Sequence, residues 1–469
     1  MTAAEPVRSG RFSPELRQIL VPLALAQFIC SFAGSNMNVM INDISQDLNT
    51  TVQGVQIAIT IFLLVMAALM IPGGKLTDKY GRKRCFLAGL ILYGIGALMS
   101  AVSPGLGVLI LGNSIFEGVG TALLIPPVYI LTTLVFTGVT TRARAFGAIS
   151  ALGGIGAAAG PLIGGLIAST LGWRWAFVFQ AAVIAAIVLL SRKIHDPLPP
   201  DPAKPFDTKG AVLSALGLVL IVAGILAADD NLWVMVALIA AGVLLLALFF
   251  RSVRTKERAG QEPLLSTALF RNRTSNLGLV TQNAQWLLLT GTSFVVSAYL
   301  QVVRGYDPIQ TGIIFTATTA GLLASSLAAE RLARRRPQRL LIQVGFVLTA
   351  VGVAALLALV TGSPSPWAFA PGLLLIGLGL GMMLTPSVNV VQSAFPDSLQ
   401  GEISGLSRSV SNLGSSLGTA VAGTILVAGI TVTPERSYGL AMAVLGVVAL
   451  VALVVAGRLP RTPAPTSAE

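Results

Sequence analysis

One carboxylate stands inside a run of apolar residues long enough to cross a bilayer. Glu117 lies in LGNSIFEGVGTALL, residues 111–124, with Asn113 and Thr121 four residues before and after it. In a helix these three side chains share a face. A charge at mid-membrane costs about 2.5 to 3.5 kcal/mol on insertion scales, and loss of water favours the neutral carboxyl. Glu117 is therefore predicted to be protonated while water is excluded from it and to release the proton when water reaches the carboxyl group.

The residues needed for metal binding, a disulfide or Ser/His catalysis are missing or badly placed. His195 is the only histidine, and Cys30 and Cys85 fall at different depths of the chain's apolar segments, which argues against a disulfide or a thiol metal site. No Ser/His catalytic centre or metal cluster can be assembled from this set. We expect no cofactor, no metal, no catalytic residues and no enzyme activity.

Composition indicates that Glu117 is positioned by a membrane-spanning helix. The 469 residues are 54% hydrophobic and 11% charged, with a mean hydropathy of +0.82. Such a chain cannot cover a water-soluble surface, so it is predicted to be an all-α polytopic membrane protein. Charged residues and Pro/Gly-rich stretches separate fourteen apolar segments that are predicted to span the membrane, at about 18–42, 52–73, 84–103, 107–130, 145–170, 175–192, 211–228, 231–250, 276–300, 309–330, 339–361, 367–392, 405–429 and 437–457.

Basic residues predict the orientation. With fourteen spans and cytoplasmic termini, all of the 31 Lys and Arg except Arg174, Arg304 and Arg436 fall on the cytoplasmic side. Loss of one span would move Arg251 and its basic neighbours to the wrong side. The net charge of +12 then reflects topology and contact with lipid headgroups, and no nucleic-acid partner is expected. The location predicted is the inner membrane of a bacterium.

An internal repeat predicts two bundles. Gly147, Gly156, Gly160 and Gly165 recur 258 residues later as Gly405, Gly414, Gly418 and Gly423. The repeat unit is six helices, so two helices are inserted between two six-helix bundles. The predicted divisions are a tail at 1–17, a bundle at 18–194, linkers with the inserted pair at 195–274, a bundle at 275–458 and a tail at 459–469.

The segment GGKLTDKYGRKR, residues 73–84, resembles the loop between helices 2 and 3 of the major facilitator superfamily, and the helix count resembles its fourteen-helix drug:proton antiporter family. The resemblance implies a conformational gate at Gly74, Asp78, Gly81 and Arg82. Asp78 at a helix end can pair with Arg82 and latch one side until rocking breaks the contacts. A simple positive-inside anchor is the alternative.

The segment GAAAGPLIGG, residues 156–165, is similar to the family's antiporter signature on helix 5, and GWRWAF follows it. Gly156, Gly160 and Gly164 leave a flat face for close helix approach, and Pro161 kinks the helix. The resemblance implies a gate at the interface of the two bundles. Glycine-mediated packing without a gating role is the alternative.

Polar residues within the spans are the candidates for a substrate cavity, because they are costly in lipid. The set comprises Gln27, Ser31, Asn38, Asn113, Gln282, Gln285, Trp286, Ser293, Asn389 and Gln392. It predicts a mostly neutral cavity, without a fixed cation, that suits bulky amphiphiles. Alternatively, these amides and hydroxyls bond neighbouring helices.

The chain departs from the family at two coupling positions. Ser114 stands where the R-x-x-Q-G motif of helix 4 has Arg, and Ala33 where many relatives have Asp. The prediction is a monomeric exporter of lipophilic or cationic drug-like compounds, working by proton antiport and alternating access with Glu117 as proton carrier. The alternative is an exporter or flippase of lipid-like or natural-product molecules, or an uncoupled facilitator, in which Glu117 is only structural.

Overall fold

The computed structural model describes residues 13–136, 139–228, 231–333, 336–360, 365–396 and 399–460, and within these ranges the regular elements are helices without any strand. The first half contains α1 (Pro14–Asn36), η1 (Met37–Met40), α2 (Ile41–Asp47), α3 (Val52–Tyr80), α4 (Arg82–Ala101), α5 (Leu106–Leu109), η2 (Ile110–Glu117), α6 (Gly118–Val135), α7 (Val139–Leu171), α8 (Arg174–Leu190) and η3 (Ser191–Lys193).

The second half begins with two apolar helices, α9 (Thr208–Leu226) and α10 (Leu232–Arg258). It continues with η4 (Thr267–Phe270), α11 (Arg273–Ala298), η5 (Tyr299–Val303), α12 (Pro308–Ala333), α13 (Gln338–Val360), η6 (Pro366–Ala368), α14 (Phe369–Gln392), α15 (Gln400–Val427) and α16 (Pro434–Ala456).

The predicted fourteen spans are confirmed. Thirteen described segments are long and apolar enough to cross a membrane, and α7, which is bent by 42°, makes the fourteenth. The break falls between Ala157 and Ala159. The ring of Pro161 clashes with the carbonyl four residues earlier, that of Ala157, so the predicted kink occurs where proline places it.

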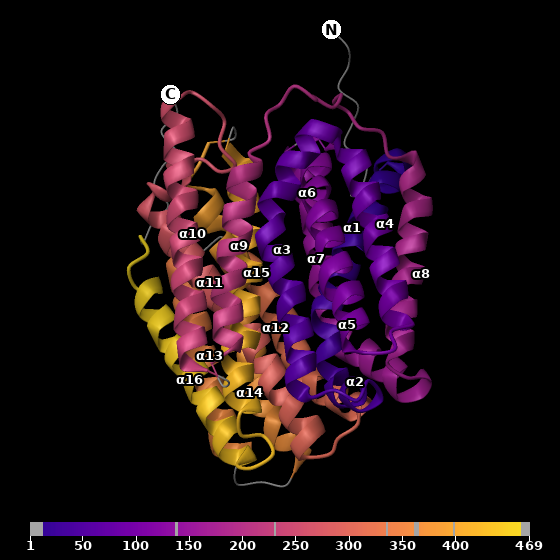
Figure 1. The fold of residues 1–469 in the computed structure, drawn as a ribbon, viewed down its shortest axis with the longest axis vertical. Helices are drawn as coiled ribbons and strands as arrows, with labels where there is room; N and C mark the ends of the chain where they lie inside the picture. The colour runs from indigo at the N-terminus through magenta and orange to yellow at the C-terminus, as the bar shows by residue number, and fades with distance from the viewer. Residues whose placement is uncertain are drawn as a thin grey trace.

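The helices form two six-helix bundles with an inserted pair, as predicted. Helices α1 to α8 pack on one another, α11 to α16 do the same, and α9 pairs with α10. The bundles meet where α3 packs on α15 and α7 packs on α12. In Figure 1 the indigo and purple bundle stands beside the orange and yellow one, with α9 and α10 in front.

The end of the molecule that contains residues 191–207 and 259–272 is called the linker end here. The first residue of α1 lies at this end, at the top of Figure 1. Arg174, Arg304 and Arg436, the three basic residues expected on the outer face, all lie at the opposite end, next to the ends of α2, α11 and α15.

Asp207 fastens the inserted pair at the linker end. Its carboxylate accepts the N–H of Gly210 at 2.7 Å, which caps α9, the N–H of Leu264 at 3.2 Å, and Lys256 Nζ at 2.6 Å. Burial raises the pKa of Asp207, but the hydrogen bonds to its charged form outweigh burial and hold that pKa below its ordinary value. The ion pair thereby joins the start of α9 to the end of α10.

The glycine repeat corresponds to matching packing in the two bundles. A Cβ on Gly156 or Gly414 would lie 2.3 Å from a backbone oxygen of α1 or α11, that of Phe28 or Asn283. Gly160 and Gly418 face the same two helices, whereas Gly165 and Gly423 face α12 and α3 of the other bundle. Gly147 and Gly405 both border open space. The surroundings of each repeated glycine are thus equivalent in the two halves.

Candidate functional site

Glu117 is the last residue of η2, a π-helix that α6 continues, and its side chain is fully buried. A Cβ on Gly96 of α4 would lie 2.5 Å from the Gly112 carbonyl oxygen and 2.9 Å from Glu117 Cγ. Only glycine therefore lets α4 approach η2 so closely. Isolated π-turns of this kind occur often at functional sites, because they re-aim side chains within a helix.

The surroundings of the Glu117 carboxyl come from the N-terminal bundle. Tyr93 of α4 and Cys30 of α1 lie within electrostatic reach of it. The Tyr93 hydroxyl donates to Gln180 Oε1 of α8, and the Cys30 thiol donates to Thr121 Oγ1 at 3.8 Å. Neither carboxyl oxygen meets hydrogen-bonding geometry with a described residue, although the Tyr93 hydroxyl lies close enough to interact with the carboxyl group; Gln180 Nε2 also lacks a partner there. The site is a sealed polar cluster around an acid.

The predicted polar stripe beside Glu117 is buried as a set, since Asn113, Glu117 and Thr121 are 2%, 0% and 0% exposed. Asn113 Nδ2 has no partner in the described part of the chain. Ser114, at the position where the family has Arg, donates its hydroxyl proton to the Ala58 carbonyl of α3 at 2.7 Å. A serine there serves helix packing and supplies no positive charge to the acid.

The predicted gate in residues 73–84 lies within one bundle and its linker. Arg82 Nη2 is 3.0 Å from Asp78 Oδ1, and Lys204 Nζ is 3.7 Å from the other oxygen of that carboxylate. Gly81 has φ of 95°, a conformation that favours glycine, and Asp196 accepts the N–H of Arg82 at 2.6 Å. Gly74 lies 3.8 Å, measured from an added Cβ, from Pro126 of α6.

The ion pair that joins this loop to the other bundle is formed by a different residue. Lys75 Nζ lies 2.9 Å from Glu402 Oε1 of α15, and Glu402 Oε2 accepts the N–H of Ser266 at 3.3 Å. Sequence reasoning missed both partners. Lys75 stands inside the quoted motif, but no feature of the sequence pointed to Glu402, 327 residues away.

Contacts between α3 and α15 continue along both helices. Gln56 Nε2 donates to the Thr419 carbonyl at 3.1 Å and to Thr424 Oγ1 at 3.2 Å, and Ser416 donates its hydroxyl proton to the Thr60 carbonyl at 3.1 Å. These bonds use backbone carbonyls and small side chains. The bundle interface is therefore closed along α3 and α15 in this structure.

The predicted glycine face of α7 packs mainly within its own bundle. A Cβ on Gly156, Gly160 or Gly164 would collide with Phe28, Ser35 or Asn36 of α1. The contact with the other bundle involves the next part of the helix. There, a Cβ on Gly312 of α12 would lie 2.5 Å from the Pro161 carbonyl oxygen.

The candidate cavity residues of the first span lie at two levels of the bundle interface. Gln27 Nε2 donates to Ser31 Oγ at 3.2 Å, while Gln27 Oε1 accepts the Tyr129 hydroxyl at 3.1 Å. Nearer the opposite end, the Asn38 carbonyl accepts Ser297 Oγ at 2.6 Å and Gln301 Nε2 at 2.8 Å from α11 and η5.

Most of the C-terminal candidates bond neighbouring helices of their own bundle, as the alternative interpretation expects. Gln282 accepts the Ser407 hydroxyl at 2.8 Å, Gln285 accepts that of Ser387 at 2.8 Å, and Gln392 donates to Ser404 at 3.2 Å. Ser293 donates to its own helix at the Leu289 carbonyl, and Trp286 and Asn389 are half-buried. The structure thus brings together the α1 residues with α6, but not the whole predicted set.

A fixed cation does lie at the bundle interface, contrary to the expectation of a cavity without one. Arg408 of α15 is half-buried, its guanidinium carbon is 4.7 Å from the centre of the Tyr129 ring, and Nη2 contacts the Tyr129 hydroxyl. Helical spacing from Ser404 and Ser411 places Arg408 on the polar face of α15, which is the signal that could have found it.

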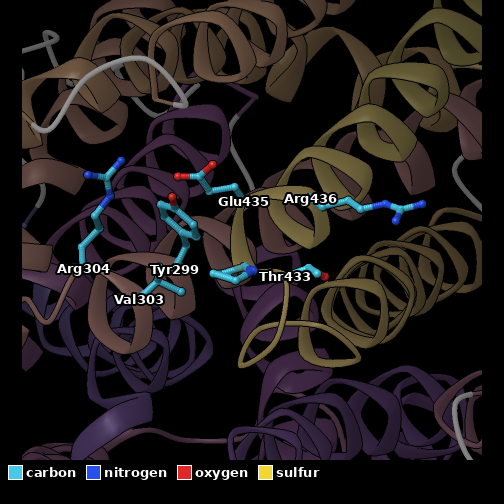
Figure 2. Close-up of a pocket in the computed structure, with 7 residues that line it drawn as sticks. Tyr299, Val303, Arg304, Thr433, Glu435 and Arg436 are labelled. Atoms are coloured by element: carbon cyan, nitrogen blue, oxygen red, sulfur yellow. The ribbon is translucent and has the colours of Figure 1, made fainter.

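The opposite end carries an open hollow of about 470 Å³. It is lined by Tyr299, Val303, Arg304, Thr433, Pro434, Glu435 and Arg436. Figure 2 shows the side chains of Arg304 and Arg436 on opposite sides of this hollow, with Glu435 beside Tyr299. A second hollow, beside α2, contains Asp47, which pairs with Arg174 and accepts the Trp173 indole N–H at 3.0 Å.

Proteins named for drug resistance, export and efflux are similar to this chain. The puromycin resistance protein pur8 of Streptomyces alboniger is 30% identical over 87% of this chain and 81% of its own. The tetracenomycin C resistance and export protein of Streptomyces glaucescens is 29% identical over 82% and 71%. The multidrug efflux pump LfrA of Mycolicibacterium smegmatis is 28% identical over 79% and 73%.

The fold also matches solved structures. A peptide transporter POT in complex with sulfate superimposes with a TM-score of 0.69 at 17% identity, covering 95% of this chain and 96% of that one. At that identity the likeness shows the fold alone. The family model for the Major Facilitator Superfamily matches residues 23–419, which is most of the chain. The chain therefore belongs to the Major Facilitator Superfamily.

Proposed function

We propose that this protein is a secondary active exporter of lipophilic, drug-like compounds, that it exchanges them for protons by alternating access, and that Glu117 carries the proton. The observation that carries the proposal is a fully buried carboxyl group that has no cationic partner among the described residues. A carboxylate left bare in that place would be strongly unfavourable, so the sealed state favours the neutral acid. Relatives named for drug resistance and efflux support export.

The polar neighbours of Glu117 provide a means of coupling. If rocking admits water to the cluster, the carboxylate becomes hydrated, and the amide of Gln180 and the hydroxyl of Tyr93 can turn towards it. Deprotonation is then linked to the open state because only that state solvates the charge. The glycine at position 96 supports this role, since α4 is in direct backbone contact with the residue that ionises.

The same proposal includes orientation and setting. The linker end is cytoplasmic, because among the described residues the opposite end carries few basic residues, Arg174, Arg304 and Arg436, and the positive-inside rule expects few on an outer face. The protein works as a monomer in the inner membrane of a bacterium. Protons, a small-molecule substrate and lipids are its partners.

One observation favours the second candidate, a facilitator or natural-product exporter in which Glu117 is structural. The contacts of Glu117 come from α1 and α4, inside the N-terminal bundle, rather than from the C-terminal bundle. In that case the neutral acid serves helix packing, with the Tyr93 hydroxyl as its hydrogen-bonding neighbour. Replacement of Glu117 by an amide would then leave transport, and whatever response it has to a proton gradient, unchanged.

Transport by proteoliposomes separates the two candidates. Ethidium movement and internal pH are recorded under an imposed pH gradient for the wild type, Glu117→Gln, and the control Glu435→Gln, which removes an exposed carboxylate at the opposite end. Coupling through Glu117 predicts that Glu117→Gln loses gradient dependence while the control keeps it. If Glu117→Gln exchanges ethidium for protons as the wild type does, the proton-carrier assignment is wrong.

A further inference from the structure

Arg408 lies within the membrane-spanning part of α15, at the interface between the two bundles. It follows Gln400, the first residue of the helix, by eight positions, or about 12 Å along the axis at 1.5 Å per residue. Its partner Tyr129 belongs to α6 of the N-terminal bundle, and the Tyr129 hydroxyl in turn donates to Gln27 of α1 at 3.1 Å. The guanidinium is thus the first member of a hydrogen-bonded chain that crosses from one bundle to the other.

No carboxylate balances this charge within the described residues, where each ion pair involves other groups. Glu402, six residues earlier on the same helix, pairs with Lys75. An arginine within a span is costly unless a partner compensates its charge. Here an aromatic face and a hydroxyl do so, and both separate from Arg408 when the bundles part.

A second aromatic ring extends the Tyr129 surface. The rings of Tyr129 and Phe146 of α7 are stacked with centroids 5.9 Å apart and an angle of 17° between planes. Gln27 and Ser31 add an amide and a hydroxyl on the adjoining face of α1. A cation, a pair of near-parallel rings and neutral hydrogen-bonding groups therefore converge at one level of the interface.

We propose that Arg408, Tyr129 and Phe146 form a substrate subsite, exposed when the linker end opens, that selects planar aromatic compounds bearing an acidic group such as a carboxylate or sulfonate. The guanidinium would bind the acidic group of the substrate through a bidentate pair of hydrogen bonds, and the two rings would stack on the planar part of the substrate. This inference rests on the proposed export function and names its substrate class. Cationic compounds such as ethidium would bind away from Arg408, because the two positive charges repel each other.

Two probes that differ mainly in charge test the subsite. Pyrenebutyrate and its trimethylammonium analogue share the planar ring system, and ethidium serves as a general export probe. Each is measured in proteoliposomes of the wild type, Arg408→Gln, Arg408→Lys and the control Arg436→Gln, an exposed arginine of the opposite end. Because a charge-assisted hydrogen bond contributes about 1.5 to 3 kcal/mol, Arg408→Gln should slow transport of the anion about ten- to a hundredfold.

Supporting results are a wild type that prefers pyrenebutyrate, an Arg408→Gln variant that loses this preference but still moves ethidium, and partial retention by Arg408→Lys. Equal slowing of the anion and the cation by Arg408→Gln would overturn the subsite and leave Arg408 as a closing contact only. A wild type that prefers the cation would also overturn it.

Binding to the purified protein separates this inference from the proposed function. Fluorescence anisotropy of pyrenebutyrate in detergent should show binding that Arg408→Gln weakens and Arg436→Gln does not. If that dependence is present while proteoliposomes move none of the three probes, the export function is wrong and the subsite stands. If ethidium is exported while pyrenebutyrate binds the wild type and Arg408→Gln alike, the subsite is wrong and export stands.

Discussion

Removal of the ion pair between Lys75 and Glu402 should favour opening of the linker end. The two charged atoms are 2.9 Å apart, and each side chain is 25% exposed, so solvent screens the pair only in part. Exposed pairs contribute about 0.2 to 1 kcal/mol, and we take the upper value of about 1 kcal/mol here. With RT of about 0.59 kcal/mol, Lys75→Gln should raise the ratio of open to closed linker ends about fivefold.

A double-mutant cycle isolates the pair. Lys75→Gln and Glu402→Gln each remove the same interaction, so the double variant should open the linker end little further than either single one. Glutamine at position 402 keeps an oxygen for the Ser266 N–H, which limits other losses. A charge swap is less informative, since lysine in the first turn of α15 would oppose the helix dipole.

Distances between spin labels report the opening. Labels at Tyr80 and Gly401, both exposed at the linker end on opposite bundles, are suited to double electron–electron resonance after the two buried cysteines are replaced by alanine. The control Asp47→Asn breaks an ion pair at the opposite end and should leave the distance distribution unchanged. Additive effects of the two single variants would refute the reasoning, because independent effects mean that the pair does not couple the bundles.

The remaining predictions concern stability in detergent. Gly156→Ala and Gly414→Ala should each lower the free energy of unfolding by about 1 to 3 kcal/mol or more, because the added Cβ collides with a backbone oxygen. Gly405→Ala should not, because Gly405 faces open space. Thermal unfolding checks this prediction, and equal unfolding temperatures for the three variants would contradict it. Because the pKa of Asp207 is depressed in the folded state, its contribution is present above the unfolded pKa of about 3.9 and is lost as pH falls through the folded value. Asp207→Asn should therefore flatten acid destabilisation below about pH 4, measured by unfolding midpoints against pH; an unchanged slope would exclude the Lys256 pair as its cause.

The number and course of the spans could be predicted because each depends on local sequence. Apolar length, the ring of Pro161 and the repeated glycines act through the segment that contains them, and all three expectations agree with the structure. The glycine repeat was informative for a physical reason: a missing Cβ is required wherever two backbones touch, and both halves touch in equivalent places.

Contacts between the bundles could not be predicted in this way. Arg408 and Tyr129 are 279 residues apart, and their types give no sign of each other. The π-helix before Glu117 was also invisible, because it arises from packing: a Cβ on Gly112 would lie 2.7 Å from the Gly96 carbonyl oxygen of α4. The position of Glu117 in the sequence was clear, but the direction of its side chain depended on that register shift.

The inserted pair has a consequence for how compounds could reach the protein from lipid. Val222 of α9 is buried together with Leu64 of α3 and Ala420 of α15, so α9 seals the crevice between the bundles along that side. Hydrophobic side chains of α10 such as Trp233, Val243 and Leu244 face outward beyond it. On this side, α9 and α10 separate the bundle interface from the lipid. A lateral entry path from the bilayer would therefore have to open on the other side of the molecule, where α7 meets α12. The two flanks of the transporter are unequal in their access to the membrane.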